Sequence, residues 1–572
     1  MIQSLASRSS ICLLALLAVT AAGQEVPQGE VLKFSFEQSK IFPGTYREYS
    51  IYIPQQYSPE KPACVHINQD GVQFNAPAVF DQLIAKGEMP VTIGIFIGHG
   101  RVKAKNPAEA LDRFNRSFEY DGLGDNYARF LLEELLPDVE TKKASDGRAL
   151  RLSKKGNDRC IAGSSSGAIC AFTAAWERPE EFSRVFSAIG TYVGLRGGHE
   201  YGTLVRKVEP KAIRIFLEDG SADQNIYAGD WWMANQELER SLTFAGYEVN
   251  HKWGDGGHNG KHATEIFPDA MRWLWKDYPQ PVKAGLGSPQ LKEILIPGED
   301  WKLVGEGYKF TEGPAANAKG EVFFNDIPNQ RTHKVDSEGE LSVLVEGSER
   351  ANGQAMGPNG NLYAIRMDAE SIMQMTPAGE WSLVKSGFRC NDLVVLHNGS
   401  IYATKPGWDG KSPSEIIYIS PTGERQVVDS GLIFANGITV SPDQTLLYVS
   451  DRSTHWVYSY QIQPDGSLAH KQKYYHLHVP DTAEDSRADG MRCDQNGRLW
   501  VATNMGLQVC DQAGRVNCIL PTPNGKCSNL CFGGPKFDTV FATCGEKVYS
   551  RKVKVNGANA WQAPMKPVAP RL

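Results

Sequence analysis

Hydrophobic and polar positions divide the chain into two regions with different patterns. From about Val31 to Pro281, apolar runs rich in β-branched residues alternate with segments whose apolar residues recur at helical spacing. This alternation predicts an α/β fold with a mostly parallel sheet. Three strand-like runs and the most regular helix-like stretch lie, in that order, at residues 49–53, 63–67, 91–97 and 127–139.

Beyond about Leu295, helical spacing disappears and short apolar strands alternate with turns of glycine, asparagine and aspartate. A strand–turn–strand unit recurs six times, at steps of about 40–50 residues, which is the spacing of propeller blades. One unit cannot bury both faces of its sheet, whereas units stacked around an axis can. We therefore predict an all-β, six-bladed propeller. The units begin at Gly313, Gly353, Asp392, Gly437, Gly490 and Leu530.

The N-terminal stretch has the pattern of a secretory signal. Ile11–Ala22 is apolar, follows Arg8 and ends in small residues. It is too short to cross a bilayer, which takes roughly 20 apolar residues. We expect export to a secreted or periplasmic location, with no membrane span left after cleavage. The predicted organisation is a signal peptide at 1–22, an α/β domain at 30–280, a linker at 281–295 and a propeller at 296–555.

Composition excludes some classes of protein but does not identify the function. The 572 residues are 41% hydrophobic and 22% charged, which excludes a disordered chain. The net charge of -6 includes no basic surplus, so we expect no nucleic-acid partner. In an oxidising compartment, some of the 11 cysteines could form disulfide bonds, although their spacing does not determine which cysteines pair. Cys527 and Cys531 have no second pair for a zinc site.

A candidate nucleophile stands in the first region. The stretch Gly163-Ser-Ser165-Ser-Gly167 has the G-x-S-x-G pattern, follows a strand-like run and opens a helix-like one. Such a turn is strained, so only small residues fit around the serine that it exposes. We predict that Ser165 is the nucleophile. The N–H of Ser166 would then face the developing oxyanion.

Serine requires a base and an orienting acid, which follow it in α/β-hydrolase order. His258 lies in a glycine-rich turn and is the predicted base, with His262 as the alternative. Asp223 follows a strand-like run and is the predicted acid, with Asp219 as the alternative.

A second oxyanion donor should come from the loop after an early strand. The stretch Asn68-Gln-Asp-Gly71-Val72 occupies this position, so we expect the N–H of Gly71, or alternatively that of Val72, to serve.

Residues 31–278 resemble a family of α/β-hydrolases that includes enterochelin, feruloyl and acetylxylan esterases. The resemblance implies a serine esterase without a cofactor. We interpret Arg116 and Glu119 as a structural ion pair. Tyr192, Arg196, His199, Trp231 and Trp232 are candidates either for an acyl or sugar pocket or for ordinary packing. The matching residues are Gln69-Asp-Gly71, Arg116-x-x-Glu119-Tyr120, the turn at Ser165, Asp223 and Gly256-Gly-His258.

A second group of candidate site residues lies at the starts of the repeat units. The innermost strand of each propeller blade begins at the central channel. Polar residues at the starts of these strands in successive blades therefore converge on one pocket. The residues in question are Glu312, Arg389, Asn391, Asn436 and Asp489. Two carboxylates and an amide oxygen suit Ca²⁺, with Mg²⁺ or Mn²⁺ as alternatives, although such residues also serve as turn formers.

Residues 307–548 resemble the SMP-30/gluconolactonase family of six-bladed propellers. The resemblance implies that Glu312, Asn436 and Asp489 bind a divalent cation, that Arg389 and Asn391 hold the substrate, and that a lactone is opened. Thr404-Lys-Pro406 departs from the aspartate-proline pair that the family often has, which leaves the substrate open. The matching stretches are Thr311-Glu-Gly-Pro314, Arg389-Cys-Asn-Asp-Leu393, Ala435-Asn-Gly437, Ala488-Asp-Gly-Met491 and Leu499-Trp-Val-Ala502.

The leading hypothesis is an exported, two-domain hydrolase that acts on carbohydrate or small-molecule substrates. One domain would remove acyl groups, such as feruloyl or acetyl, and the other would open sugar lactones. Two alternatives remain: an esterase whose propeller is a calcium-stabilised glycan-binding module, and a siderophore esterase. The acidic charge balance argues against the last, because a ferric siderophore is anionic. The oligomeric state stays open.

Overall fold

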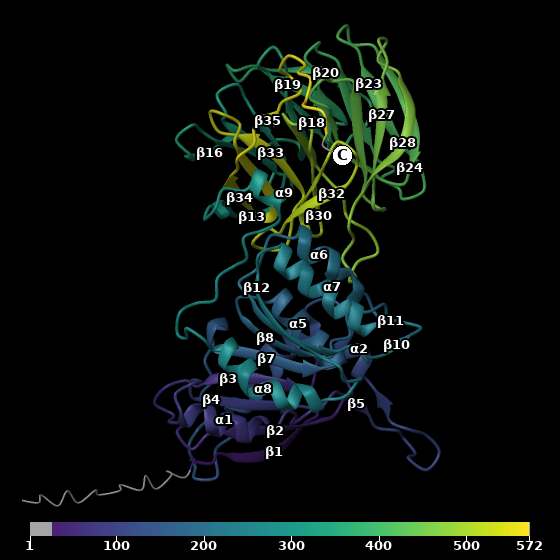
Figure 1. The fold of residues 1–572 in the computed structure, drawn as a ribbon. Helices are drawn as coiled ribbons and strands as arrows, with labels where there is room; N and C mark the ends of the chain where they lie inside the picture. The colour runs from purple at the N-terminus through teal and green to yellow at the C-terminus, as the bar shows by residue number, and fades with distance from the viewer. Residues whose placement is uncertain (1–25, 571–572) are drawn as a thin grey trace, which may run out of the picture.

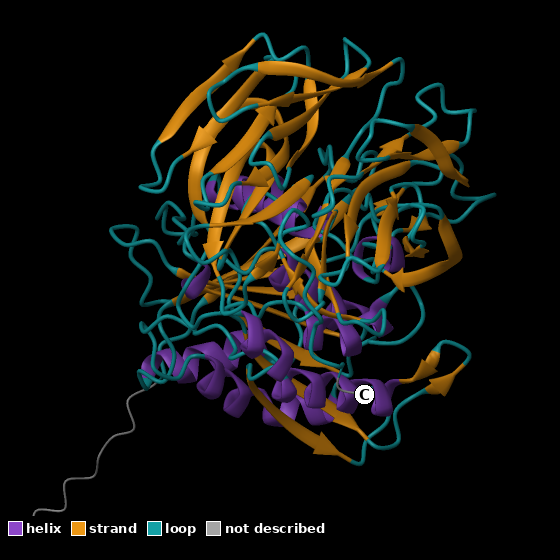
Figure 2. Cartoon of the chain, turned by 90° about the horizontal axis from the view of Figure 1, so that it is seen from above, coloured by secondary structure: helices purple, strands orange, loops and turns teal. Residues whose placement is uncertain are grey.

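The structure, a computed structural model, describes residues 26–570. Two domains are stacked, the α/β domain below and the β-propeller above in Figure 1. Figure 2 shows that helices are concentrated in the first domain, whereas strands and loops build most of the second. The predicted signal peptide lies outside the described residues. None of the helices in residues 26–570 is long and apolar enough to cross a membrane.

The first domain is built on an eight-stranded sheet. The last six strands in the spatial order pair in parallel, whereas β1 and β2 are antiparallel, so the sheet is mixed. The inner parallel strands β4, β3, β7 and β8 are buried on both faces, which explains their mostly apolar sequences. In spatial order the strands are β1 (Glu30–Phe36), β2 (Arg47–Ile53), β4 (Thr92–Ile97), β3 (Cys64–Gln69), β7 (Arg159–Ser164), β8 (Arg184–Ala188), β9 (Arg214–Gly220) and β12 (Glu248–Gly254).

Helices cover both faces of this sheet. The buried side chains of α1 and α8 form one core with each other, and those of α3 to α7 share the other core. The helical stretch predicted over 127–139 is present, but it contains a π-helical segment at Phe130–Leu135. The helices are α1 (Ala76–Ala85), α2 (Arg116–Tyr120), α3 (Asn126–Arg129), α4 (Leu136–Glu140), α5 (Ser166–Glu177), α6 (Tyr201–Lys207), α7 (Trp231–Phe244) and α8 (Lys261–Leu274).

Smaller elements complete the α/β domain. Two hairpins project from it and each consists of two-residue strands. Two 3₁₀ turns lie at Gly156–Asp158 and Gly198–Glu200. The hairpin strands are β5 (Arg101–Val102), β6 (Arg113–Phe114), β10 (Asn225–Ile226) and β11 (Gly229–Asp230).

The second domain is a β-propeller of five sheets in the described residues, so the prediction of six blades is wrong. The cause is β13 (Lys302–Ala316), which pairs with β14 through one half and with β34 through the other. The first and last sequence repeats therefore share one six-stranded sheet. In spatial order that sheet contains β16 (Leu341–Glu346), β15 (Arg331–Val335), β14 (Val322–Asp326), β13, β34 (Thr539–Lys552) and β33 (Asn529–Gly533).

The four other sheets each contain one repeat, and their innermost strands are β17, β21, β25 and β29. Together with β13 and β33, these strands contact one another in a closed ring around the axis. The strands are β17 (Ala351–Met356), β18 (Leu362–Arg366), β19 (Ser371–Met375), β20 (Trp381–Ser386), β21 (Leu393–Val395), β22 (Ile401–Lys405), β23 (Ser414–Ile419), β24 (Arg425–Leu432), β25 (Ala435–Val440), β26 (Leu446–Asp451), β27 (Trp456–Ile462), β28 (Leu468–His476), β29 (Met491–Asp494), β30 (Leu499–Thr503), β31 (Gly506–Cys510), β32 (Val516–Leu520) and β35 (Gly557–Ala558).

The connection between the domains is packed rather than loose. A short helix, α9 (Pro289–Ile294), forms inside the stretch predicted as a linker, and Ser288 caps it. Leu291 and Ile294 are buried against propeller residues, because Pro289 starts a helix that places both on one side. All ten cysteines of the described chain are free, so the structure contains no disulfide there.

The two domains also touch directly. Val208 pairs with Ile519 of β32 in a parallel bridge, and the Glu209 N–H donates to the Ile519 carbonyl at 2.9 Å. The Arg551 guanidinium, which is almost fully buried, donates to both carboxylate oxygens of Glu209 at 2.7 and 2.6 Å. Figure 1 shows α6 and α7 on the side of the first domain that faces the propeller.

Candidate active sites

Ser165 lies in a sharp turn between β7 and α5. Its backbone has φ 60° and ψ −122°, a strained conformation for a residue with a side chain. Glycine is required nearby, because a Cβ at Gly163 would lie 2.2 Å from the Gly167 carbonyl oxygen. The G-x-S-x-G sequence therefore produces the strained, exposed serine that the motif predicts.

His258 lies between Ser165 and Asp223. Its Nε2 is 2.8 Å from the Ser165 Oγ, and its Nδ1 is 2.6 Å from the Asp223 Oδ1. The loops that carry the acid and the base are tied together, because the Ala222 N–H donates to the Gly256 carbonyl at 3.1 Å. The structure thus brings the three predicted residues into one hydrogen-bonded relay.

The Asp223 carboxylate is held ionised. Burial alone would raise its pKa, but hydrogen bonds from His258 and Asp219 outweigh burial, so the pKa lies below its usual value. Asp219 behaves in the opposite way: burial, followed by its hydrogen bond to Asp223, raises the pKa of Asp219 to about 9. At neutral pH, Asp219 is therefore a protonated acid beside an ionised one.

The two alternatives from the sequence have other partners. Asp219 is fully buried and accepts hydrogen bonds from the Gly220 N–H and the Asn235 Nδ2. The His262 Nδ1 lies 2.8 Å from the Glu218 Oε1, which makes a second histidine–carboxylate pair beside the relay. Neither alternative contacts Ser165 in the described structure.

The predicted oxyanion donors differ in availability. Ser166 begins α5, where the first helical N–H groups have no intrahelical acceptor. The Gly71 N–H donates to the Ile97 carbonyl at 3.1 Å, so the prediction that this N–H faces the oxyanion needs correction. The N–H of Val72, the alternative, has no hydrogen-bond partner among residues 26–570 and is free to donate.

The interpretation of Arg116 and Glu119 as an ion pair is wrong, because each has another partner. Arg116 donates to both Asp70 oxygens, at 2.7 Å in the shortest contact, and its Nη2 reaches the Ser164 carbonyl. Glu119 pairs with Arg47, and both side chains are fully buried. Arg116 thereby links the loop before Gly71 to the turn that carries Ser165.

The five residues proposed for an acyl or sugar pocket divide between packing and surface. Tyr192 and Trp231 are buried, and the Trp231 Nε1 donates to Thr191, whose hydroxyl lies 3.3 Å from the Ser165 Oγ. Trp232 stacks edge-on against Trp253, and the Arg196 Nε donates to Ser117. His199 lies beside Glu200 on the surface.

In the propeller, two of the three candidate metal-binding residues, Glu312 and Asn436, present a buried oxygen without a partner in the described chain. Glu312 is 5% exposed; its Oε2 accepts from the Asn529 Nδ2 at 2.8 Å, whereas its Oε1 has no hydrogen bond to the described residues. The Asn436 Oδ1, also buried, has none either. Uncompensated burial of such groups is costly, so these atoms fit a ligand.

Negative charge accumulates around these oxygens. Burial raises the pKa of Glu312 to about 7. Burial, followed by the charges of Glu312 and Asp392, holds the pKa of Asp489 well above its usual value. Asp392 is 2% exposed and its Oδ2 has no partner in the described chain. Asp392 and Asn529 were not among the predicted site residues, although Asp392 directly follows Asn391 in the sequence.

A divalent cation fits this donor set. The described residues hold no tight group of three or more His, Cys, Asp or Glu side chains, and the candidate set is instead two carboxylates and one amide oxygen. Hard cations such as Ca²⁺ and Mg²⁺ prefer oxygen ligands of this kind. A cation here would offset the burial and, after it, the repulsion between acids that raise the pKa values of Glu312 and Asp489.

Arg389 and Asn391 lie just before β21. The Arg389 guanidinium is 4.8 Å from the centre of the Trp408 ring, and its Nε is buried without a partner in the described structure. The backbone of Asn391 pairs with Gly353 and Thr404, which fixes it at the start of an inner strand.

Comparison with known families matches both domains. Residues 40–271 match the family described as "Putative esterase", and residues 310–546 match the "SMP-30/Gluconolactonase/LRE-like region". The chain therefore contains one region that is similar to the esterase family and one that is similar to the SMP-30/gluconolactonase family.

Individual relatives match one domain at a time. A gluconolactonase of Zymomonas mobilis is 25% identical over 306 residues, which are 47% of this chain and 86% of that protein. A regucalcin of Oryctolagus cuniculus is 27% identical over 246 residues, 40% of this chain and 80% of its own. The enterobactin esterase of Shigella flexneri is 20% identical, with a TM-score of 0.33, and covers 44% of this chain and 61% of its own.

Proposed function

We propose that the α/β domain hydrolyses carboxylic esters through an acyl intermediate on Ser165. His258 would take the proton of the Ser165 hydroxyl as general base and return it to the leaving alcohol. Asp223 would hold the imidazole in the required tautomer and stabilise its charged form. The observation that carries the proposal is the relay at 2.8 and 2.6 Å on a strained turn.

The transition state requires stabilisation of a negative oxygen. The N–H groups of Ser166 and Val72 are the donors that the geometry favours, with Arg116 fixing the distance between their two loops. Removal of one such donor typically costs about a hundredfold in kcat. The esterase reaction requires no cofactor in this scheme.

For the propeller, we propose lactone hydrolysis at the ring of inner-strand starts. Glu312, Asn436 and Asp489 would hold a divalent cation, with Ca²⁺ favoured by the oxygen donors. When bound, the cation would polarise a lactone carbonyl and lower the pKa of water. Asp489 would accept the proton of the attacking water, while Arg389 and Asn391 would bind the substrate.

The substrate class we favour is carbohydrate-linked, with feruloyl or acetyl esters for the first domain and sugar lactones for the second. The relatives named gluconolactonase support the second part, and they match only the propeller. Export through the N-terminal segment completes the proposal and gives access to extracellular saccharides.

Mass spectrometry of products tests this proposal. A mixture of acetylated and feruloylated xylo-oligosaccharides would be incubated with the wild type and with Ser165→Ala. We expect acetate or ferulate from the wild type alone. Release by both proteins would contradict the role of Ser165, and release by neither would contradict the carbohydrate-ester class.

A further inference from the structure

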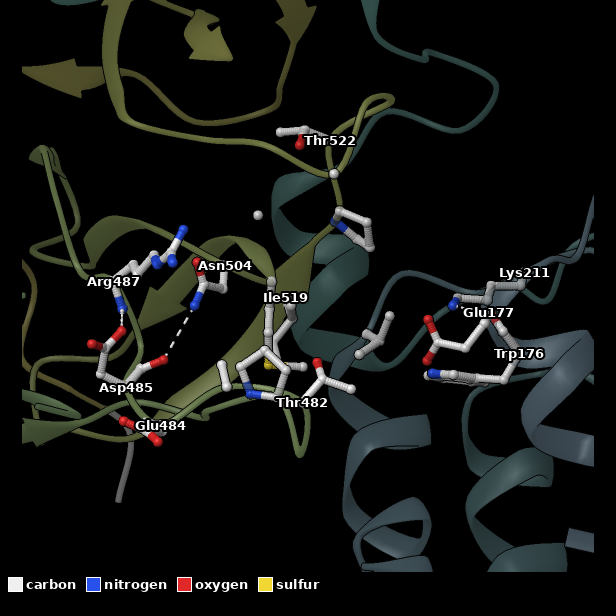
Figure 3. Close-up of a pocket in the computed structure, with 17 residues that line it drawn as sticks. Trp176, Glu177, Lys211, Thr482, Glu484, Asp485, Arg487, Asn504, Ile519 and Thr522 are labelled. Carbon is white, nitrogen blue, oxygen red and sulfur yellow. Dashed lines mark hydrogen bonds between the residues drawn. The ribbon is translucent and has the colours of Figure 1, made fainter. Parts of the chain in front are cut away.

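A cleft of about 690 Å³ lies between the two domains. Figure 3 shows Trp176, Glu177 and Lys211 of the α/β domain on one side, and Asp485, Arg487 and Asn504 of the propeller on the other. The volume falls within the roughly 300–1,000 Å³ typical of small-molecule sites.

The cleft is separate from both candidate centres. None of the 17 residues that line it belongs to the relay or to the candidate metal set. Glu177 ends the helix that Ser166 begins, so the cleft lies about 17 Å along α5 from the nucleophile. On the propeller side, Arg487 precedes Asp489 by two residues, so the cleft borders the face on which the inner strands start.

Five charged side chains line the cleft, and none of them forms an ion pair with a described residue. They comprise three carboxylates and two cations, a net of one negative charge. The Lys211 ammonium donates to the Trp176 carbonyl and lies 4.2 Å from the centre of the Trp176 ring, which leaves donors unused. The five are Glu177, Lys211, Glu484, Asp485 and Arg487.

Uncharged hydrogen-bonding groups lie among these charges. Thr482 and Thr522 contribute hydroxyl groups, and the Asn504 amide donates to the Asp485 carbonyl at 3.2 Å while its oxygen remains available. Sugar hydroxyls both donate and accept, so they satisfy carboxylates and cations alike. The slight negative balance disfavours an anion. Trp176 is only 5% exposed, so recognition would rest on hydrogen bonds rather than on ring stacking.

We propose that this interdomain cleft binds a neutral oligosaccharide and holds the saccharide between the esterase domain and the propeller. The walls are fixed relative to each other by the Arg551–Glu209 pair and the Val208–Ile519 bridge. A rigid cleft binds without the cost of ordering its walls. The proposal goes beyond the two hydrolytic activities, because a bound saccharide need carry neither an ester nor a lactone.

Calorimetric titration of the full chain with xylotriose tests the proposal. We expect saturable binding that Glu177→Gln and Arg487→Met each weaken about tenfold, since each removes a charged hydrogen-bonding group from one wall. Glu60→Gln and Lys61→Met, on an exposed loop of the α/β domain, are the matched controls and should bind as the wild type does.

Other outcomes overturn the proposal. Absence of xylotriose binding, or equal binding by all four variants, would exclude the cleft as the site. Tighter binding of sodium gluconate would exclude a neutral ligand. Hydrogen exchange of the wild type, with xylotriose added, should show protection at residues 176–177 and 484–487, and this measurement does not depend on any variant folding. Because xylotriose has no scissile ester or lactone, the result is independent of either hydrolytic activity.

Discussion

The two candidate centres differ in how complete they are within the chain itself. In the α/β domain, short hydrogen bonds join Ser165, His258 and Asp223, and only the Asp223 Oδ2 is buried without a hydrogen-bond partner in the described chain. In the propeller, Glu312 and Asn436 point buried oxygens at no described partner, and the neighbouring acids repel each other. The first centre is a hydrogen-bonded relay. The second leaves buried oxygens without donors, and our proposal assigns a cation to them.

This difference shows that the same residue type has opposite roles in the two domains. Asp223 stays ionised because His258 and Asp219 donate to it. Asp489 has a raised pKa because burial and two neighbouring acids oppose its ionisation. Hydrogen bonds keep the Asp223 carboxylate ionised, whereas burial and neighbouring acids oppose ionisation of Asp489.

The largest expected effect comes from the nucleophile. Ser165→Ala should lower kcat for a carboxylic ester by about 10⁴-fold or more, because the acyl intermediate cannot form. Hydrolysis of a sugar lactone should persist in the same sample. Loss of both activities in a folded variant would contradict the independence of the two centres. Release of p-nitrophenol from p-nitrophenyl acetate, measured beside lactone titration, checks the prediction.

The second largest effect is expected from Glu312 in the propeller. Glu312→Gln keeps the shape of the side chain but removes its charge, so we expect lactone hydrolysis to fall about a hundredfold or more. Glu338→Gln, an exposed acid of the same domain, is the matched control. Stopped-flow pH-indicator assays would measure both. Equal lactone rates in the two variants would contradict a cation at Glu312.

The protonated Asp219 of the α/β domain should make the stability of the protein depend on pH. Its raised pKa means that the folded state retains a proton which the unfolded state loses near pH 3.8, so stability falls as pH rises from there toward about 9. Asp219→Asn removes this loss, because an amide mimics the neutral acid. We expect the Tm advantage of Asp219→Asn over the wild type to be a few degrees larger at about pH 8 than at pH 5. A constant difference in calorimetry would mean that Asp219 does not titrate in this range.

The smallest effect is expected at the domain boundary. Arg551→Met removes a buried partner of Glu209, which should cost about 1–3 kcal/mol and separate the unfolding of the two domains. Arg331→Met breaks an exposed pair with Glu346 and should cost about 0.5 kcal/mol or less. Differential scanning calorimetry distinguishes the two. Equal costs would show that the boundary pair does not join the domains.

Sequence patterns predicted the strands and the turn at Ser165 well, because both depend on short-range signals. The runs at 49–53, 63–67 and 91–97 coincide with β2, β3 and β4, since alternation and buried apolar runs reflect strand geometry directly. The glycines around Ser165 indicate one strained turn. Chain order left His258 or His262 as the base and Asp223 or Asp219 as the acid, and the fold brings His258 and Asp223 to Ser165.

The features that the sequence failed to predict depend on pairing between residues far apart in the chain. Six repeats were visible, but β13 joins the first and last repeats in one sheet, and no local pattern encodes that pairing. The Gly71 N–H looked available until the fold placed the Ile97 carbonyl against it. Arg116 and Glu119 are close in sequence, yet their partners Asp70 and Arg47 come from other strands and loops.

The difference between the two centres can be measured in a single sample of the full chain. Ester and lactone hydrolysis would be followed there during titration with EDTA and then with excess Ca²⁺. We expect the ester rate to stay constant while the lactone rate falls with EDTA and returns with Ca²⁺. Loss of both rates together, or retention of the lactone rate after complete chelation, would contradict this expectation.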